Sequence, residues 1–141
     1  MKLNKLILKM KINFKTHKKL FLLDQDGTLY KGKHLFPYTI SFLNAIRDSG
    51  ARYLFITNNS SRSTAQYVSK MKSFGIECYH NHFYTSTHAT IDYIKKHHPN
   101  KSVFLVGTTA LVAEFLENSI KLTTKKDEVG IAVLSYDTEL N

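Results

Sequence analysis

The sequence LFLLDQDGTL at residues 20–29 decides the fold. Residues 20–23 form a continuous apolar run that has the length of a buried strand. The run ends at Asp24, and Gly27 lets the backbone turn sharply three residues later. We therefore predict a strand of a buried sheet that opens directly into a polar loop.

Strands and helices alternate along the rest of the chain. Apolar runs predict strands at 53–56, 82–85, 102–106 and 129–134, and helical spacing predicts helices from Pro37 to Gly50 and over 63–75, 87–96 and 109–119. This order implies right-handed crossovers and a mostly parallel sheet that is covered on both faces. The predicted class is therefore α/β, with a three-layer, Rossmann-like parallel sheet.

Composition excludes several classes of protein. The 141 residues fit about one domain of roughly 100–200 residues, and 43% hydrophobic with 22% charged residues is typical of a globular chain. No apolar run approaches the ~20 residues of a membrane span. Because Cys78 is the single cysteine, no intrachain disulfide can form, and we expect a cytoplasmic protein.

Positive charge is concentrated at the start of the chain. The net charge is +9, but residues 1–19 hold seven lysines and no acid, which leaves +2 for residues 20–141. Residues 1–19 are thus a basic leader, either a short amphipathic helix or a loosely docked segment. We expect no nucleic-acid partner, and a small basic nucleic-acid-binding protein is the least favoured of the alternatives.

A polar cluster follows directly after each of two predicted strands. One is residues 24–29, and the other is residues 57–60. Ligands of open α/β sheets bind outside the carboxyl ends of strands, so both clusters should open onto the same rim. A bland alternative is that Asp-Gly and Asn-Asn merely form loops. Two such clusters across one β-α-β unit make that alternative weak.

The first cluster has the residues of a phosphoryl-transfer site. Asp24 ends a buried strand, where a carboxylate without a partner is costly. Asp26 is near enough to share a hard cation such as Mg²⁺, and the N–H of Gly27 can face an anion. One aspartate can attack phosphorus while the other serves as acid and base. Thr57 and Asn58 add uncharged donors for phosphate oxygens.

Residues 22–30 resemble motif I (DxDGT) of the haloacid dehalogenase-like hydrolase superfamily. Residues 55–60 are similar to motif II of its class IIA branch, the nitrophenylphosphatase-like sugar and nucleotide phosphatases. Softer matches occur at residues 83–86 and 106–107. The resemblance runs from Leu20 to the end of the chain.

The resemblance implies a Mg²⁺-dependent phosphatase that hydrolyses a small phosphorylated metabolite through an aspartyl-phosphate intermediate. In that pattern Asp24 is the nucleophile and a Mg²⁺ ligand. Asp26 is the acid and base and binds Mg²⁺ through its carbonyl. Thr57 and Asn58 hold the phosphoryl group, with backbone around Gly27. Gln25 departs from the pattern, which has an apolar residue between the aspartates.

The resemblance also implies an incomplete core. Residues 20–98 match its first half, and residues 101–141 match the start of an inserted α/β cap. A lysine motif and an acidic motif of the family have no counterpart here, so we expect little activity from this chain alone. The alternatives are a non-catalytic remnant and a half-protein that needs a second chain. Self-association or a complementing chain is therefore expected.

Overall fold

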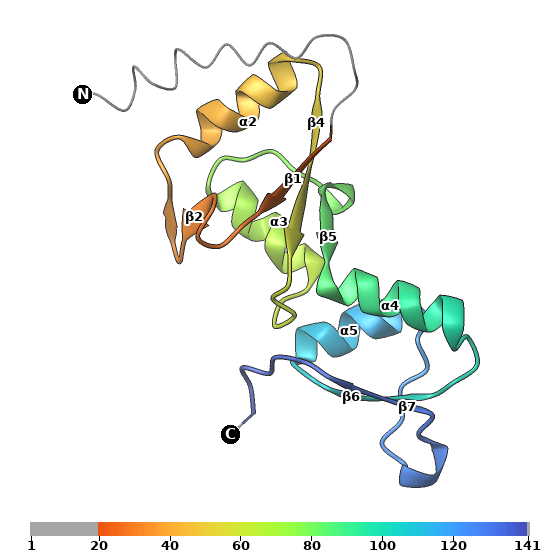
Figure 1. Cartoon of the computed structure of the whole chain (residues 1–141). Helices are drawn as coiled ribbons and strands as arrows, with labels where there is room; N and C mark the ends of the chain where they lie inside the picture. The colour runs from red at the N-terminus through yellow and green to blue at the C-terminus, as the bar shows by residue number, and fades with distance from the viewer. Residues whose placement is uncertain (1–19, 141) are drawn as a thin grey trace. The chain divides into compact units, whose positions relative to one another are not determined.

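The computed structural model describes residues 20–140 (Figure 1). The basic leader predicted at residues 1–19 lies outside the described residues. The described residues divide into two compact units, 20–54 and 55–140. The proposed division at residues 98–101 is a different one, and it stays a prediction.

Within residues 20–54, the first unit, the structure describes short strands and one helix. The elements of this unit are β1 (Leu20–Asp24), β2 (Tyr30–Lys31), β3 (His34–Leu35), α2 (Thr39–Asp48) and the start of β4 (Arg52–Thr57). Buried Leu23, Leu29, Leu43 and Ile46 contribute to its apolar interior. On α2 the buried face runs through Thr39, Leu43 and Ile46, whereas Ile40 is exposed.

The sequence prediction missed the hairpin formed by β2 and β3. Tyr30 pairs with Leu35 and Lys31 with His34 in antiparallel register. The two-residue turn between these strands starts with Gly32 at φ 59°, a conformation that glycine adopts without strain. Two-residue strands are too short for an alternating pattern to reveal, and only the glycine between two lysines marked this turn.

The second unit contains the remaining elements. They are the end of β4, α3 (Thr64–Ser73), the 3₁₀ turn η1 (His80–His82), β5 (Phe83–Thr85), α4 (Ser86–His97), β6 (Val103–Val106), α5 (Thr109–Glu117), the 3₁₀ turn η2 (Lys126–Glu128) and β7 (Ile131–Leu134). Each of the predicted helices and strands is present within a few residues of its expected bounds. The α/β class is therefore confirmed.

The strands of the described residues belong to more than one sheet. Strands β1, β4 and β5 belong to one sheet in that order, while β6 and β7 form a separate two-stranded sheet. The pairs β4–β5 and β6–β7 are both parallel, as predicted. Figure 1 shows α4 and α5 on one face of the β6–β7 sheet.

That face carries a continuous apolar core. Its buried members are Ile91, Ile94, Val103, Leu111, Phe115 and Ile120, and Leu105, Ile131 and Val133 pack against them. Side chains on a strand alternate between faces, so Phe104 and Leu134 lie on the opposite, exposed face. Among the helices that the structure describes, none is long and apolar enough to cross a membrane.

Candidate functional site

The loop after β1 is a tight, hydrogen-bonded turn. The carbonyl oxygen of Gln25 accepts the amides of Thr28, Leu29 and Tyr30 at 3.2, 2.8 and 3.3 Å. Gly27 has φ 84°, in the left-handed region where a side chain is strained. The sharp turn expected at this glycine is thus present.

Residues at the start of α2 donate hydrogen bonds to this loop. The hydroxyl of Tyr38 donates to the carbonyl of Thr28 at 3.0 Å, and the hydroxyl of Thr39 donates to the carbonyl of Leu29 at 2.6 Å. Neither contact was predicted, because nothing in the sequence pairs residues ten positions apart across a hairpin. Their effect is to fix the loop that carries the two aspartates.

The structure changes two details of the expected chemistry. Asp24 and Asp26 are both exposed, so Asp24 is not the buried carboxylate that the strand-end argument assumed. The hydroxyl of Thr28 lies 3.5 Å from Oδ2 of Asp24, as a long hydrogen bond. The amide of Gly27 donates to the carbonyl of Tyr30 at 2.7 Å, so this N–H serves the turn rather than facing outward to an anion.

The side chain between the two aspartates is buried. Gln25 is 1% exposed. Its Oε1 lies 3.5 Å from the hydroxyl of Tyr30, and its Nε2 has no hydrogen-bond partner within residues 20–140. A buried amide donor of this kind is destabilising, whereas an apolar side chain at the same place would not be.

The donor set of this loop fits Mg²⁺ in type. Mg²⁺ binds oxygen ligands and usually keeps several waters, with one or two carboxylates from the protein. Two exposed carboxylates on one short loop meet that description and leave room for water. Within the described part of the chain there is no group of three or more acidic, histidine or cysteine side chains that could hold a metal ion.

The loop after β4 is also ordered by its own side chains. The amide of Asn59 donates to Oγ1 of Thr57 at 3.2 Å, and Oδ1 of Asn59 accepts from the amide and the hydroxyl of Ser61. The hydroxyl of Ser86, at the start of α4, donates to the carbonyl of Asn58 at 3.1 Å. Because Oγ1 of Thr57 accepts this hydrogen bond, the Thr57 hydroxyl can still donate its proton to another group.

The predicted site residues therefore form two groups. Asp24, Asp26 and Gly27 lie together in the first unit, and Thr57 with Asn58 lies in the second. That both groups line one rim stays a prediction.

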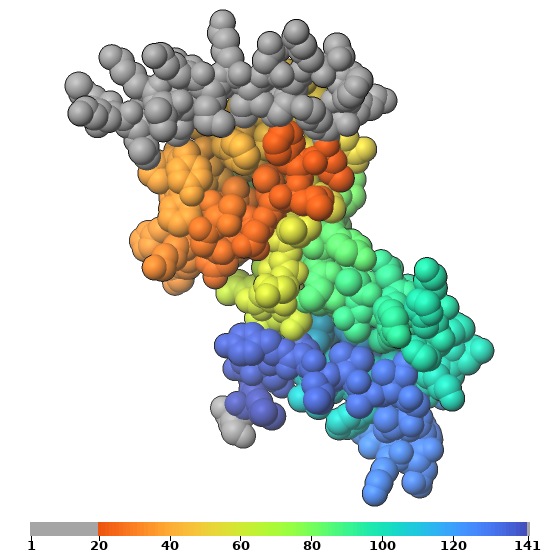
Figure 2. Space-filling view, in the orientation of Figure 1, coloured from red at the N-terminus to blue at the C-terminus, as the bar shows by residue number. Residues whose placement is uncertain are grey.

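Sequence reasoning missed the residues that hold the second group. The hydroxyl of Ser135 and the amide of Tyr136 reach Oγ of Ser60 at 2.7 and 3.2 Å, and Figure 2 shows these two segments in contact at the surface. Thr108 and Glu114 make further contacts with residues 61–64. No local pattern marks such pairs, since the partners lie far apart in the chain.

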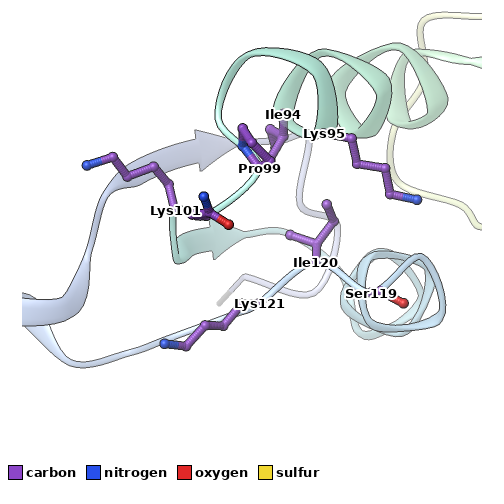
Figure 3. A pocket seen from close by; sticks show the side chains of 8 residues that line it. Ile94, Lys95, Pro99, Lys101, Ser119, Ile120 and Lys121 are labelled. Atoms are coloured by element: carbon purple, nitrogen blue, oxygen red, sulfur yellow. The ribbon is translucent and has the colours of Figure 1, made fainter.

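A cavity of about 320 Å³ lies at the opposite end of α4 from Asn58 (Figure 3). Its wall includes Lys95, Lys101 and Lys121, and the figure shows their amino groups directed outward. The 12 residues of α4 span roughly 18 Å. The cavity is therefore separate from the loop after β4.

A family model for haloacid dehalogenase-like hydrolases matches residues 21–121. The chain is 30% identical over 125 residues to an acid sugar phosphatase of Staphylococcus epidermidis, covering 88% of this chain and 48% of that protein. It is 34% identical over 120 residues to 5′-nucleotidase YutF of Bacillus subtilis, covering 85% and 46%.

A solved structure gives the same result. The 4-nitrophenylphosphatase of Thermotoga maritima superposes with a TM-score of 0.80 at 30% identity, over 88% of this chain and 47% of that one. The chain thus spans about half the length of the proteins that it matches.

Proposed function

Because the chain belongs to the haloacid dehalogenase-like hydrolase family, we propose that it carries part of the active site of a phosphatase. The substrate is a small phosphomonoester, a sugar phosphate or a nucleotide. The observation that carries the proposal is the loop after β1, where Asp24 and Asp26 expose two carboxylates around a turn at Gly27. The acid sugar phosphatase and 5′-nucleotidase among its relatives support the substrate class.

The reaction uses each aspartate in a different way. A carboxylate oxygen of Asp24 attacks phosphorus, and the bond to the leaving oxygen breaks as Asp26 gives that oxygen a proton. Asp26 then takes a proton from water, which attacks the aspartyl-phosphate. Phosphate leaves and Asp24 is regenerated. The hydroxyl of Thr57 and the amide of Asn58 donate to the phosphoryl oxygens.

Asp24, through its carboxylate, and Asp26, through its carbonyl, would hold Mg²⁺. When bound, the ion neutralises charge on the transferring phosphoryl group. The hydroxyl of Thr28 lies 3.5 Å from Oδ2 of Asp24, so the carboxylate has one long, weak contact in its own loop.

The test uses the chain itself. MgCl₂ is titrated into ¹⁵N-labelled protein, and the backbone amides of Asp24 and Asp26 are followed by NMR. Asp24→Asn should weaken the response about tenfold or more. Asp48→Asn, an exposed aspartate on α2, is the matched control and should respond like the wild type. A wild type without response, or an equal response of Asp24→Asn, contradicts the metal site.

Catalysis is tested in a chain extended to the length of its relatives. Asp24→Asn should abolish hydrolysis of p-nitrophenyl phosphate while circular dichroism stays unchanged. Retention of more than a few per cent of turnover would rule out Asp24 as the nucleophile.

A second candidate is a half-protein that functions with another polypeptide. The observation favouring it is exposed apolar surface on β1. Leu20 and Leu22 on β1 are each 58% exposed and offer apolar surface for such a partner or for a second copy. Sedimentation that gives a monomer at all concentrations would argue against self-association.

We propose that the protein is located in the cytoplasm.

A further inference from the structure

Hydrogen bonds join the segment that follows Asn58 to residues far away in the chain. We call this set of hydrogen bonds the clasp. It joins Ser60 to Ser135 and Tyr136, Ser61 to Thr108, and Thr64 to Glu114. All of these residues belong to the second unit. The clasp therefore connects the loop after β4 with α5 and with the segment after β7.

Glu114 is the unusual member of the clasp. It lies in α5 between the buried residues Leu111 and Phe115 and is only 5% exposed. Its Oε2 accepts the amide of Thr64 at 3.0 Å, and its Oε1 accepts the hydroxyl of Thr64 at 2.6 Å. Nε2 of His88 lies 3.8 Å from Oε1. Both carboxylate oxygens are thus directed at the first turn of α3.

This carboxylate caps α3 in addition to Ser63, because it accepts a different amide of the first turn. Ser63 already caps α3, since its hydroxyl accepts from the amide of Gln66 and the Gln66 side chain accepts from the amide of Ser63. An acidic group is favourable at a helix N-terminus. Burying it in an apolar core is costly, however, and a leucine would fill the same place in α5. A buried polar side chain whose oxygens both accept hydrogen bonds from one residue can fix one geometry.

Glu114 is connected to the loop after β4 through α3. The hydroxyl of Tyr67, one turn after Thr64, donates to the carbonyl of Asn59 at 2.8 Å. The amide of Asn59 in turn donates to Oγ1 of Thr57. A shift of α3 would therefore move Asn59 and reorient the hydroxyl of Thr57.

We propose that Glu114 is a positioning residue for phosphate binding by the loop of Thr57 and Asn58. It acts by locking the start of α3 and does not itself touch phosphate. This inference rests on the proposed function, which assigns phosphate binding to that loop. It adds that α5 is a part of the binding site's framework.

The experiment compares variants of two glutamates on the same helix. Glu114→Leu removes both acceptors of Thr64. Glu114→Gln keeps them in part, because the amide oxygen can accept from the Thr64 amide while its NH₂ donates to the Thr64 hydroxyl. Glu117→Leu makes the same change at an exposed position of α5 and is the matched control.

Inorganic phosphate is titrated with MgCl₂ into each ¹⁵N-labelled variant, well below its melting temperature, and the amides of Thr57, Asn58 and Asn59 are followed. Glu114→Leu should raise the phosphate Kd about tenfold or more. Glu114→Gln should stay within about threefold of the wild type. Hydrogen exchange at the amides of Asn59 and Ser61 should accelerate in Glu114→Leu alone.

Each outcome has a separate meaning. If the wild-type amides do not respond to phosphate, the proposed function of this loop is wrong and the inference falls with it. If the wild type responds and Glu114→Leu has the same Kd, only the inference is wrong. If Glu114→Leu fails to fold, Thr64→Val replaces it. Thr64→Val should raise the Kd severalfold, and an unchanged Kd overturns the inference.

Discussion

Replacing Gln25 by leucine should stabilise the protein, although the residue lies between the two proposed catalytic aspartates. Its Nε2 is buried and has no partner in residues 20–140. Such a group costs about 1–3 kcal/mol of stability. The one hydrogen bond that is lost, to the hydroxyl of Tyr30, is 3.5 Å long and contributes little. We expect a net gain of about 1–2 kcal/mol.

The gain can be read from thermal unfolding. With an unfolding entropy of about 2 cal/mol/K per residue, a chain of 141 residues gains roughly 3–4 °C in Tm for each kcal/mol. Gln25→Leu should therefore raise Tm by about 3–7 °C. Calorimetry or circular dichroism measures it.

Two further substitutions show whether the reasoning holds. Gln25→Glu has nearly the same shape but buries a carboxylate, so it should lower Tm. The chain's other glutamine, Gln66, is satisfied in the capping box of α3, and Gln66→Leu should also lower Tm. A fall in Tm for Gln25→Leu would refute the argument, because it would show that the Gln25 amide has a stabilising partner.

Two other predictions concern the ends of strands and helices. Gly27→Ala meets no atom within 4 Å of the added Cβ, so its cost should be backbone strain alone, about 1–2 kcal/mol in urea denaturation at φ 84°. A larger loss would indicate a steric clash. Hydrogen bonds from the amide and hydroxyl of Thr109 hold the pKa of Glu139 below its ordinary value. The stability it contributes is complete above the unfolded-state pKa and is lost as pH falls through the folded-state pKa. Denaturation from neutral to acidic pH should therefore show a loss of stability in the wild type that Glu139→Gln lacks. Identical profiles would contradict a stabilising role for the hydrogen bonds between Thr109 and Glu139.

Local patterns predicted the regular elements because those elements depend on local forces. The apolar runs at residues 20–23 and 53–56 became β1 and β4, and Ser63, the first residue of the helix predicted over 63–75, caps α3. The hairpin of β2 and β3 was not predicted, because strands of two residues are too short to show a periodic pattern. Alternation of strands and helices does not say which strands pair, so it could not separate the β6–β7 pair from the sheet of β1, β4 and β5.

The candidate site divides in the same way. Asp24, Asp26 and Gly27 could be singled out because a strand end, two acids and a glycine are adjacent in the sequence. The exposure of Asp24 could not be predicted, because it depends on how the loop turns after the strand. Glu114 had no signal at all, since on a helical pattern a glutamate between apolar residues is read as a solvent-facing position.

The clasp has a consequence for the order in which the protein folds. Its hydrogen bonds join residues 47 to 76 positions apart. Closing such long segments costs more chain entropy than forming a helix or a hairpin, so these contacts should form late. Interactions that are absent from the folding transition state change the unfolding rate and leave the folding rate nearly unaltered. Phosphate bound at the loop of Thr57 and Asn58 should accordingly prolong the lifetime of the native state without making the chain fold faster.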